Sequence, residues 1–108
     1  MRKGTAAVYK IVYLPLAEDD ILATVEYIAG KLDNPPAAEA LLDELDRTVE
    51  QLALFPYSSE LYHTDRPMRD ELRKVPVKGY MLYYTVRDDT VEIRRLIHGR
   101  RDRSQIAY

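Results

Sequence analysis

Cysteine is absent from the 108-residue sequence, and this absence excludes disulfide bonds and thiolate metal sites. The four glycines are isolated from one another, so no glycine-rich loop is available to cradle a phosphate. The two histidines lack the spacing of a metal-binding motif, and no Ser–His arrangement indicates nucleophilic catalysis. We therefore expect no metal and no cofactor.

Long hydrophobic runs are also missing, and Leu52–Phe55 is typical of the longest. A membrane-spanning helix needs about 20 apolar residues, so no membrane association is predicted. The basic start, Met1–Gly4, is not followed by the apolar core of a signal peptide. We expect a cytoplasmic protein, and a hydrophobic content of 46% in 108 residues predicts one domain over residues 1–108.

The net charge of −2 conceals a strong asymmetry along the chain. Residues 1–60 contain five basic and eleven acidic side chains, a net charge of −6. Residues 61–108 contain eleven basic and seven acidic side chains, a net charge of +4, and nine of the eleven are arginines. This distribution indicates an anionic partner, either nucleic acid or an acidic peptide, for the second half of the chain.

Two amphipathic helices are predicted in the first half of the chain. The first begins at Pro15, and its apolar side chains recur every three or four residues at Ala17, Ile21, Val25, Ile28 and Leu32. The acidic run 18–20 suits the positive end of that helix. Asn34 caps the second helix, whose stripe is Ala38, Leu41, Leu42, Leu45, Val49 and Leu52. A short connection predicts an antiparallel hairpin.

Strands are predicted on both sides of this hairpin. Alternating, β-branched and aromatic sequence indicates strands at residues 8–14, 72–75, 80–86 and 91–98, with a loop over 57–70. Pro76 places the second of these at a sheet edge or a strand end. The order β-α-α-β-β-β predicts an α+β fold, with the helical hairpin on one face of a small, mainly antiparallel sheet of three or four strands. We expect residues 1–7 and 103–108 to be flexible.

The densest chemical signal is a run of five arginines and one histidine within residues 94–103. Guanidinium groups bind phosphate with two parallel hydrogen bonds, and histidine transfers protons near neutral pH. Two interpretations follow from these residues. The run is either a site that binds phosphate and cleaves RNA, or a solvated basic strand end in which His98 makes a structural hydrogen bond.

The neighbouring strands add cations and aromatic rings to this region. Arg73, Lys74 and Lys78 flank one strand, but the alternation of side chains lets only one of Arg73 and Lys74 point to a given face. Tyr80 and Tyr84 share a face of the next strand. Exposed tyrosines beside arginines suit base stacking or a peptide interface, whereas tyrosines on strands are also ordinary half-buried core.

The chain resembles the RelE/ParE superfamily in its element order and in four sequences, Leu72-Arg73-Lys74-Val75, Gly79-Tyr80-Met81-Leu82-Tyr83-Tyr84, Val91-Glu92-Ile93 and His98-Gly99-Arg100-Arg101-Asp102. This superfamily comprises the toxins of type II toxin–antitoxin modules, also called plasmid stabilisation proteins. The resemblance extends from about Val8 to Asp102. It implies the α+β fold described above and a cognate antitoxin that wraps the toxin and masks its active surface.

The superfamily divides by activity, and the resemblance leaves two hypotheses. RelE-type members are ribosome-dependent endoribonucleases that cut mRNA without a metal, whereas ParE-type members are regarded as inhibitors of DNA gyrase. The RelE-type pattern has a catalytic Arg where this chain has Met81 and a Lys where it has Leu72, although Lys74 and Arg101 match. The ending at residues 98–102 is more similar to ParE-type sequences, which favours gyrase over the ribosome and mRNA as the target.

Each hypothesis implies a set of working residues. For a ParE-like toxin, the resemblance and the basic second half predict target binding by Arg73, Lys74, Lys78, Tyr84, Arg94, Arg100 and Arg101. For the ribonuclease alternative, Arg101 stabilises the phosphate and His98 or Lys74 transfers a proton. The antitoxin is expected to contact the basic half through an acidic segment, and helix positions such as Leu22 and Ala29 through an apolar face.

Overall fold

The structure is a computed structural model, and it describes residues 8–64, 68–101, 104 and 106–108. Its elements are β1 (Lys10–Tyr13), α1 (Pro15–Glu26), the π-helical turn η1 (Tyr27–Lys31), α2 (Pro35–Leu54), β2 (Glu60–Leu61), β3 (Leu72–Val77), β4 (Tyr80–Arg87) and β5 (Thr90–His98). Residues 1–7, 103 and 105, which the sequence predicts to belong to flexible ends, lie outside the described residues.

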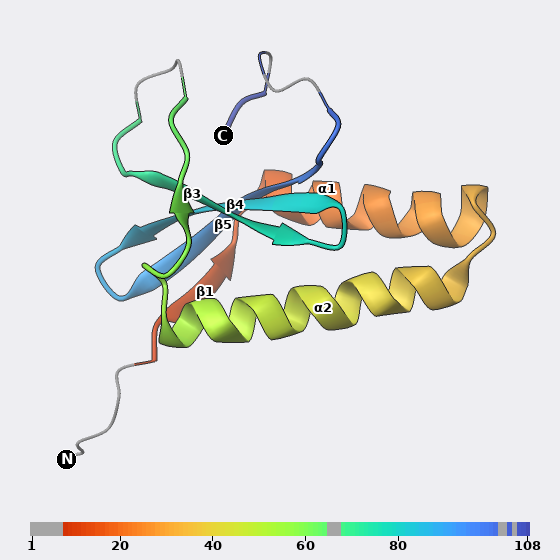
Figure 1. Ribbon diagram of the computed structural model, residues 1–108, viewed down its shortest axis with the longest axis horizontal. Coiled ribbons are helices and arrows are strands. Elements are labelled where there is room, and N and C mark those ends of the chain that lie inside the picture. The colour runs from red at the N-terminus through yellow and green to blue at the C-terminus, as the bar shows by residue number, and fades with distance from the viewer. Residues whose placement is uncertain (1–7, 65–67, 102–103, 105) are drawn as a thin grey trace.

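The strands form one sheet in the order β1-β5-β4-β3-β2, with β1 parallel to β5 and the other pairs antiparallel. Both helices cover the same face of the sheet and run antiparallel to each other (Figure 1). The predicted α+β fold is therefore confirmed. The number of strands is a correction, because Glu60–Leu61 pairs with β3 inside the predicted loop and gives five strands among the described residues.

The end of the first helix departs from its predicted apolar stripe. In η1 the N–H of Leu32 donates to the carbonyl of Tyr27 at 2.9 Å, a spacing of five residues that widens the turn. The wider turn moves the next side chain off the α-helical line through Ala17 and Ile28. Leu32, predicted on the buried stripe, is consequently 53% exposed.

The second helix begins where the sequence predicts. The Asn34 side chain accepts a hydrogen bond from the Ala37 N–H at 3.2 Å, and Pro35 occupies the first helical position. Its predicted stripe is buried against the sheet at Ala38, Leu41, Leu45, Val49 and Leu52. The main core thus lies between the hairpin and the sheet, where the strands contribute Leu82, Tyr84, Val91, Ile93 and Leu96.

A β-bulge on β5 changes which side chains reach that core. Residues 83 and 84 of β4 pair with Arg95 and Ile93, so Arg94 is the extra residue between two consecutive pairs. The bulge reverses the alternation of side chains. Ile93 and Leu96, three residues apart, both pack in the helix-side core, and Ile97 packs on the opposite face.

A buried ion pair links the helical layer to the sheet. Arg95 donates to Asp20 of α1 from Nε at 2.7 Å and from Nη2 at 3.0 Å, and the two side chains are only 11% and 14% exposed. Asp20 also accepts the N–H of Leu96 at 3.0 Å, where β5 extends beyond its last pair with β1. The acidic run 18–20 thus supplies the counter-ion of a buried arginine as well as favourable charge for the helix start.

We predict that Asp20→Asn lowers the free energy of unfolding by about 3 kcal/mol, because it leaves the buried Arg95 guanidinium without its counter-ion. Urea denaturation followed by circular dichroism measures the change. Asp19→Asn, at the exposed neighbouring position, is the matched control and should change stability by less than about 0.5 kcal/mol. Equal effects in the two variants would contradict the assignment.

Candidate functional site

The turn between β3 and β4 lies against the end of β5. The N–H of Gly99 donates to the carbonyl of Gly79 at 2.9 Å. A Cβ on Gly99 would lie 3.1 Å from that oxygen, so glycine permits the close approach. Lys78 and Gly79 have φ values of 44° and 82°, the left-handed pair that a two-residue type I′ hairpin turn requires.

This contact gathers exposed side chains at one end of the sheet, which we call the basic edge: Lys78, His98, Arg100 and Arg101. The chain turns back on itself after β5, because the N–H of Arg101 donates to the His98 carbonyl at 3.0 Å. Lys78, Arg100 and Arg101 make no ion pair with another described residue. Their charges are therefore available to an external anion.

His98 has a structural role at this edge. Its Nδ1 accepts the Arg100 N–H at 3.1 Å, and its ring stands edge-on to Tyr80 with centroids 5.2 Å apart. One of the two interpretations of the arginine run assigned such a hydrogen bond to His98. Partial burial raises the pKa of Tyr80 above its ordinary value, and the neighbouring Tyr27 adds to the increase.

A groove adjoins the basic edge on the helix side of the sheet. It has a volume of about 550 Å³ and is lined by Ala23, Thr24, Tyr27, Leu32, Tyr80 and His98. The π turn helps to form it, because Tyr27 and Leu32 are 49% and 53% exposed there. This groove was not predicted from the sequence. One sequence feature could have indicated it: Ala23 and Tyr27 are four residues apart, so they are neighbours on the helix surface, and both lie outside the predicted stripe.

Lys74 lies on the other face of the sheet. Its Nζ is 5.3 Å from the centre of the Tyr62 ring, which packs in the smaller apolar cluster with Leu72 and Tyr83. His98, by contrast, lines the groove next to α1. The two alternative proton-transfer residues of the ribonuclease hypothesis are therefore on opposite faces.

Arg94 is also engaged on the face that carries Lys74. Its Nε donates to the Tyr108 carbonyl at 2.7 Å, and its Nη1 lies 3.5 Å from Glu92 Oε1. Its side chain is 22% exposed. Arg94 is thus mainly an internal contact, although the sequence predicts it to bind the target.

Two further predicted target-binding residues, Arg73 and Tyr84, hold the chain that follows α2. Tyr84 is 0% exposed, and its hydroxyl donates to the Pro56 carbonyl at 2.7 Å. Arg73 donates to the Ser59 carbonyl at 2.9 Å and lies over the Tyr57 ring at 5.1 Å. Tyr84 is a correction, because its strand face is the one that the helices cover and it offers no surface to a target.

The last described residues correct a second expectation. Ile106, within the segment 103–108 predicted to be flexible, is 3% exposed and packs in the smaller apolar cluster. The Tyr108 ring contacts Tyr62 and Tyr83, with centroids 5.8 and 4.8 Å apart. Burial raises the pKa of Tyr108 above its ordinary value, and the neighbouring Tyr83 and Tyr62 add to the increase.

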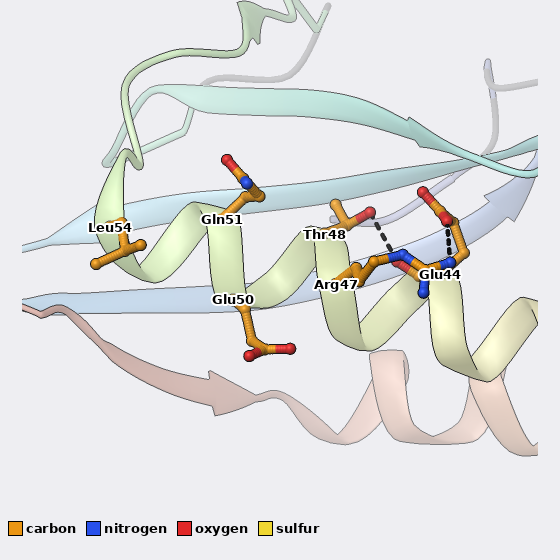
Figure 2. A pocket seen from close by; sticks show the side chains of 6 residues that line it. All are labelled: Glu44, Arg47, Thr48, Glu50, Gln51 and Leu54. Atoms are coloured by element: carbon orange, nitrogen blue, oxygen red, sulfur yellow. Dashed lines mark hydrogen bonds and ion pairs between the residues drawn. The ribbon is translucent and has the colours of Figure 1, made fainter.

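A second hollow, of about 450 Å³, lies along the outer side of α2 (Figure 2). Its lining comes from one helix, and its Arg47 is already paired with Glu44 at 2.6 Å. That hydrogen bond raises the pKa of Arg47 above its ordinary value. The hollow has the ordinary chemistry of a solvated helix face, and the basic edge with its groove is the candidate functional site.

No helix in the described residues combines the length and the apolar character needed to cross a membrane. No group of three or more His, Asp or Glu side chains in the same residues is arranged to hold a metal ion.

Comparison with known proteins assigns the family. Residues 11–103 match the family described as the ParE toxin of type II toxin–antitoxin systems, parDE, and the chain belongs to this family. No curated protein gives a match. A solved structure described as "Chromosomal ParDE TA system from P. aeruginosa" has a similar fold, with a TM-score of 0.67 and 14% identity over 85% of this chain and 97% of that chain. The predicted membership of the ParE branch and the role of type II toxin are confirmed.

Buried tyrosines predict a loss of stability at alkaline pH. Burial raises the pKa values of Tyr13, Tyr84 and Tyr108, so these groups stay neutral in the folded chain where the unfolded chain ionises near pH 10. Their stabilising contribution is complete below pH 10 and is lost as the pH rises toward the folded pKa values. We expect the free energy of unfolding in urea to fall from pH 9 to pH 11, and to fall less in Tyr108→Phe. Tyr57→Phe, at an exposed ring, is the control and should leave the decrease unchanged.

Proposed function

We propose that this toxin inhibits DNA gyrase by direct contact through the basic edge, and that a cognate antitoxin neutralises it. A ParE toxin belongs to a toxin–antitoxin pair, so the family itself implies the antitoxin. Lys78, Arg100 and Arg101 form a compact positive surface whose charges are not consumed by other described residues. Such a surface steers the approach of an acidic partner and fixes its orientation. A gyrase target implies a cytoplasmic toxin.

The separation of Lys74 from His98 carries this choice, because it leaves the basic edge with only one of the two alternative proton-transfer residues. Cleavage of RNA by attack of its 2′-hydroxyl needs a base, an acid and a cation within hydrogen-bond reach of one phosphate. Lys74 packs on Tyr62 on one face of the sheet, whereas His98 lines the groove on the other. Met81 stands where the ribonuclease pattern has an arginine. These features support a toxin that binds its target over the alternative, a ribosome-dependent mRNA endoribonuclease.

The groove beside α1 is the surface that best suits the antitoxin. Leu32 lines the groove and is 53% exposed, whereas Leu22 is 60% exposed on another side of α1. Ala29 is partly buried against the core, so it offers less to a partner than Leu22 does. A segment lying in this groove reaches His98 and hence the basic edge. The antitoxin would therefore cover the target-binding surface directly.

We predict that the double variant Arg100→Ala, Arg101→Ala inhibits gyrase-catalysed supercoiling at least tenfold less than the parent toxin, a loss of about 1.4 kcal/mol in binding. Both side chains are exposed, so the fold should be retained. Arg47→Ala, which removes an exposed arginine from α2, is the control. Undiminished inhibition by the double variant, or transcripts cut at ribosome-occupied codons after expression of the toxin, would contradict the proposal.

We predict that the variant Tyr27→Ser, Leu32→Ser binds the antitoxin at least tenfold more weakly, because it removes exposed apolar area from the lining of the groove. Isothermal titration calorimetry measures the affinity, and the rise in melting temperature on mixing gives a second estimate. Phe55→Ser is the matched control, because Phe55 is 60% exposed and follows the far end of α2. An equal loss of affinity in the control would contradict the assignment of the groove, because any exposed apolar side chain would then contribute equally to antitoxin binding.

A further inference from the structure

Residues 106–108 cross the face of the sheet that the helices leave uncovered. Figure 1 shows the C-terminal end of the chain near the strands. Ile106 is 3% exposed among Leu72, Tyr83 and Ile97, and the Tyr108 ring lies against Tyr62 and Tyr83, whereas Ala107 between them is exposed. The segment is therefore extended, with alternate side chains directed into the sheet. We call residues 106–108 the strap.

Two arginines of the bulged strand hold the main chain of the strap. Arg94 donates to the Tyr108 carbonyl at 2.7 Å, and Nη1 of Arg95 donates to the Ala107 carbonyl at 2.8 Å. Hydrogen bonds from charged donors are short and stronger than neutral ones. Asp20 fixes the other two donating nitrogens of Arg95, so the guanidinium is already oriented when it meets the strap.

The strap therefore fixes the chain on the far side of the two exposed arginines of the basic edge. On the near side, the bonds from Gly99 to Gly79 and from Arg101 to His98 already fix the chain where it leaves β5. Arg100 and Arg101 are at the near attachment, and residues 102–105 connect Arg101 to the strap. A segment held at both ends loses less conformational freedom on binding than a free tail, and a preorganised contact binds more tightly.

We propose that the strap positions Arg100 and Arg101 for the target, and that Tyr108 and Arg94 are positioning residues for this interaction. The proposal rests on the proposed function of the basic edge. It gives a role to the tyrosines on the uncovered face of the sheet. Neither the family match nor the basic residues alone imply that role. The strap touches no target, and it acts through the two arginines that it holds in place.

Limited proteolysis tests the strap without reference to any target. Trypsin should cleave after Arg100 and Arg101 about tenfold faster in Tyr108→Ala, the change that about 1.4 kcal/mol of lost strap contacts produces. Tyr108→Phe keeps the ring, and Ala107→Ser alters an exposed side chain of the strap, so both should keep the parent rate. Cleavage after Arg47 on α2 reports global unfolding. An unchanged rate at Arg100 and Arg101 in Tyr108→Ala overturns the proposal.

A second variant guards against loss of the fold. Arg94→Gln removes the guanidinium bond to the Tyr108 carbonyl but leaves Ile106 and the tyrosine rings in place. It should also accelerate cleavage at Arg100 and Arg101, with the rate after Arg47 unchanged. Acceleration at all three arginines together would mean that the variant only unfolds the chain, and it would count against the proposal.

Binding kinetics to immobilised gyrase separate positioning from charge. Tyr108→Ala keeps every cation, so the association rate and its dependence on salt should be retained while dissociation accelerates about fivefold. Arg100→Ala, Arg101→Ala should instead weaken the salt dependence of association. Faster proteolysis of Tyr108→Ala with undiminished gyrase inhibition by the double arginine variant would refute the proposed target surface. Lost inhibition by that double variant, with unchanged proteolysis of Tyr108→Ala, would refute the strap alone.

Discussion

The buried pair of Asp20 and Arg95 is the interaction on which the rest of the molecule depends. A single carboxylate receives two bonds from the guanidinium and one from the backbone of Leu96, so it joins α1 to the edge of β5. The remaining nitrogen of Arg95 holds the carbonyl of Ala107. Helix, strand and strap therefore share one electrostatic centre. Because a charge buried this deeply is costly when unpaired, the three elements are energetically coupled.

The two faces of the sheet differ in what covers them. The helix side contains the main core and, next to the π turn, the groove proposed to receive the antitoxin. The opposite side carries the smaller apolar cluster, which includes the tyrosines and the strap. The basic edge lies at the end of the sheet, where Gly79 and Gly99 bring both of its segments together. This arrangement supports the proposed role of the basic edge in binding.

Local signals explain most of what could be predicted from the sequence. The start of α2 follows from Asn34 and Pro35 because a cap and a proline act within one turn. Pro76 was expected at an edge, and it lies where β3 extends beyond its two pairs with β2. The target-binding role of Lys78, Arg100 and Arg101 was also predicted from local sequence, because a turn that contains glycine and the end of a strand can both be recognised there.

Features set by distant contacts could not be predicted in this way. The partner of Arg95 is 75 residues away, and alternation alone does not mark Arg94 as a bulge. Alternation correctly grouped Tyr80 with Tyr84, yet it could not say that the helices cover this face, so Tyr84 was expected at the surface. The strap was expected to be flexible because a short polar tail contains no periodicity, and its order comes from arginines on another strand.

The π turn at the end of α1 has a consequence for how toxins of this kind diversify. A π turn contains one residue more than the α-helical turn it replaces, so its presence depends on a single insertion in the chain. Loss of one residue within Tyr27–Lys31 would rewind the helix and return the side chain now at Leu32 to the core line. The groove would then close while the sheet and the basic edge kept their geometry. In the proposed arrangement, recognition of the antitoxin can thus change with one residue of chain length, independently of the surface proposed to meet the target.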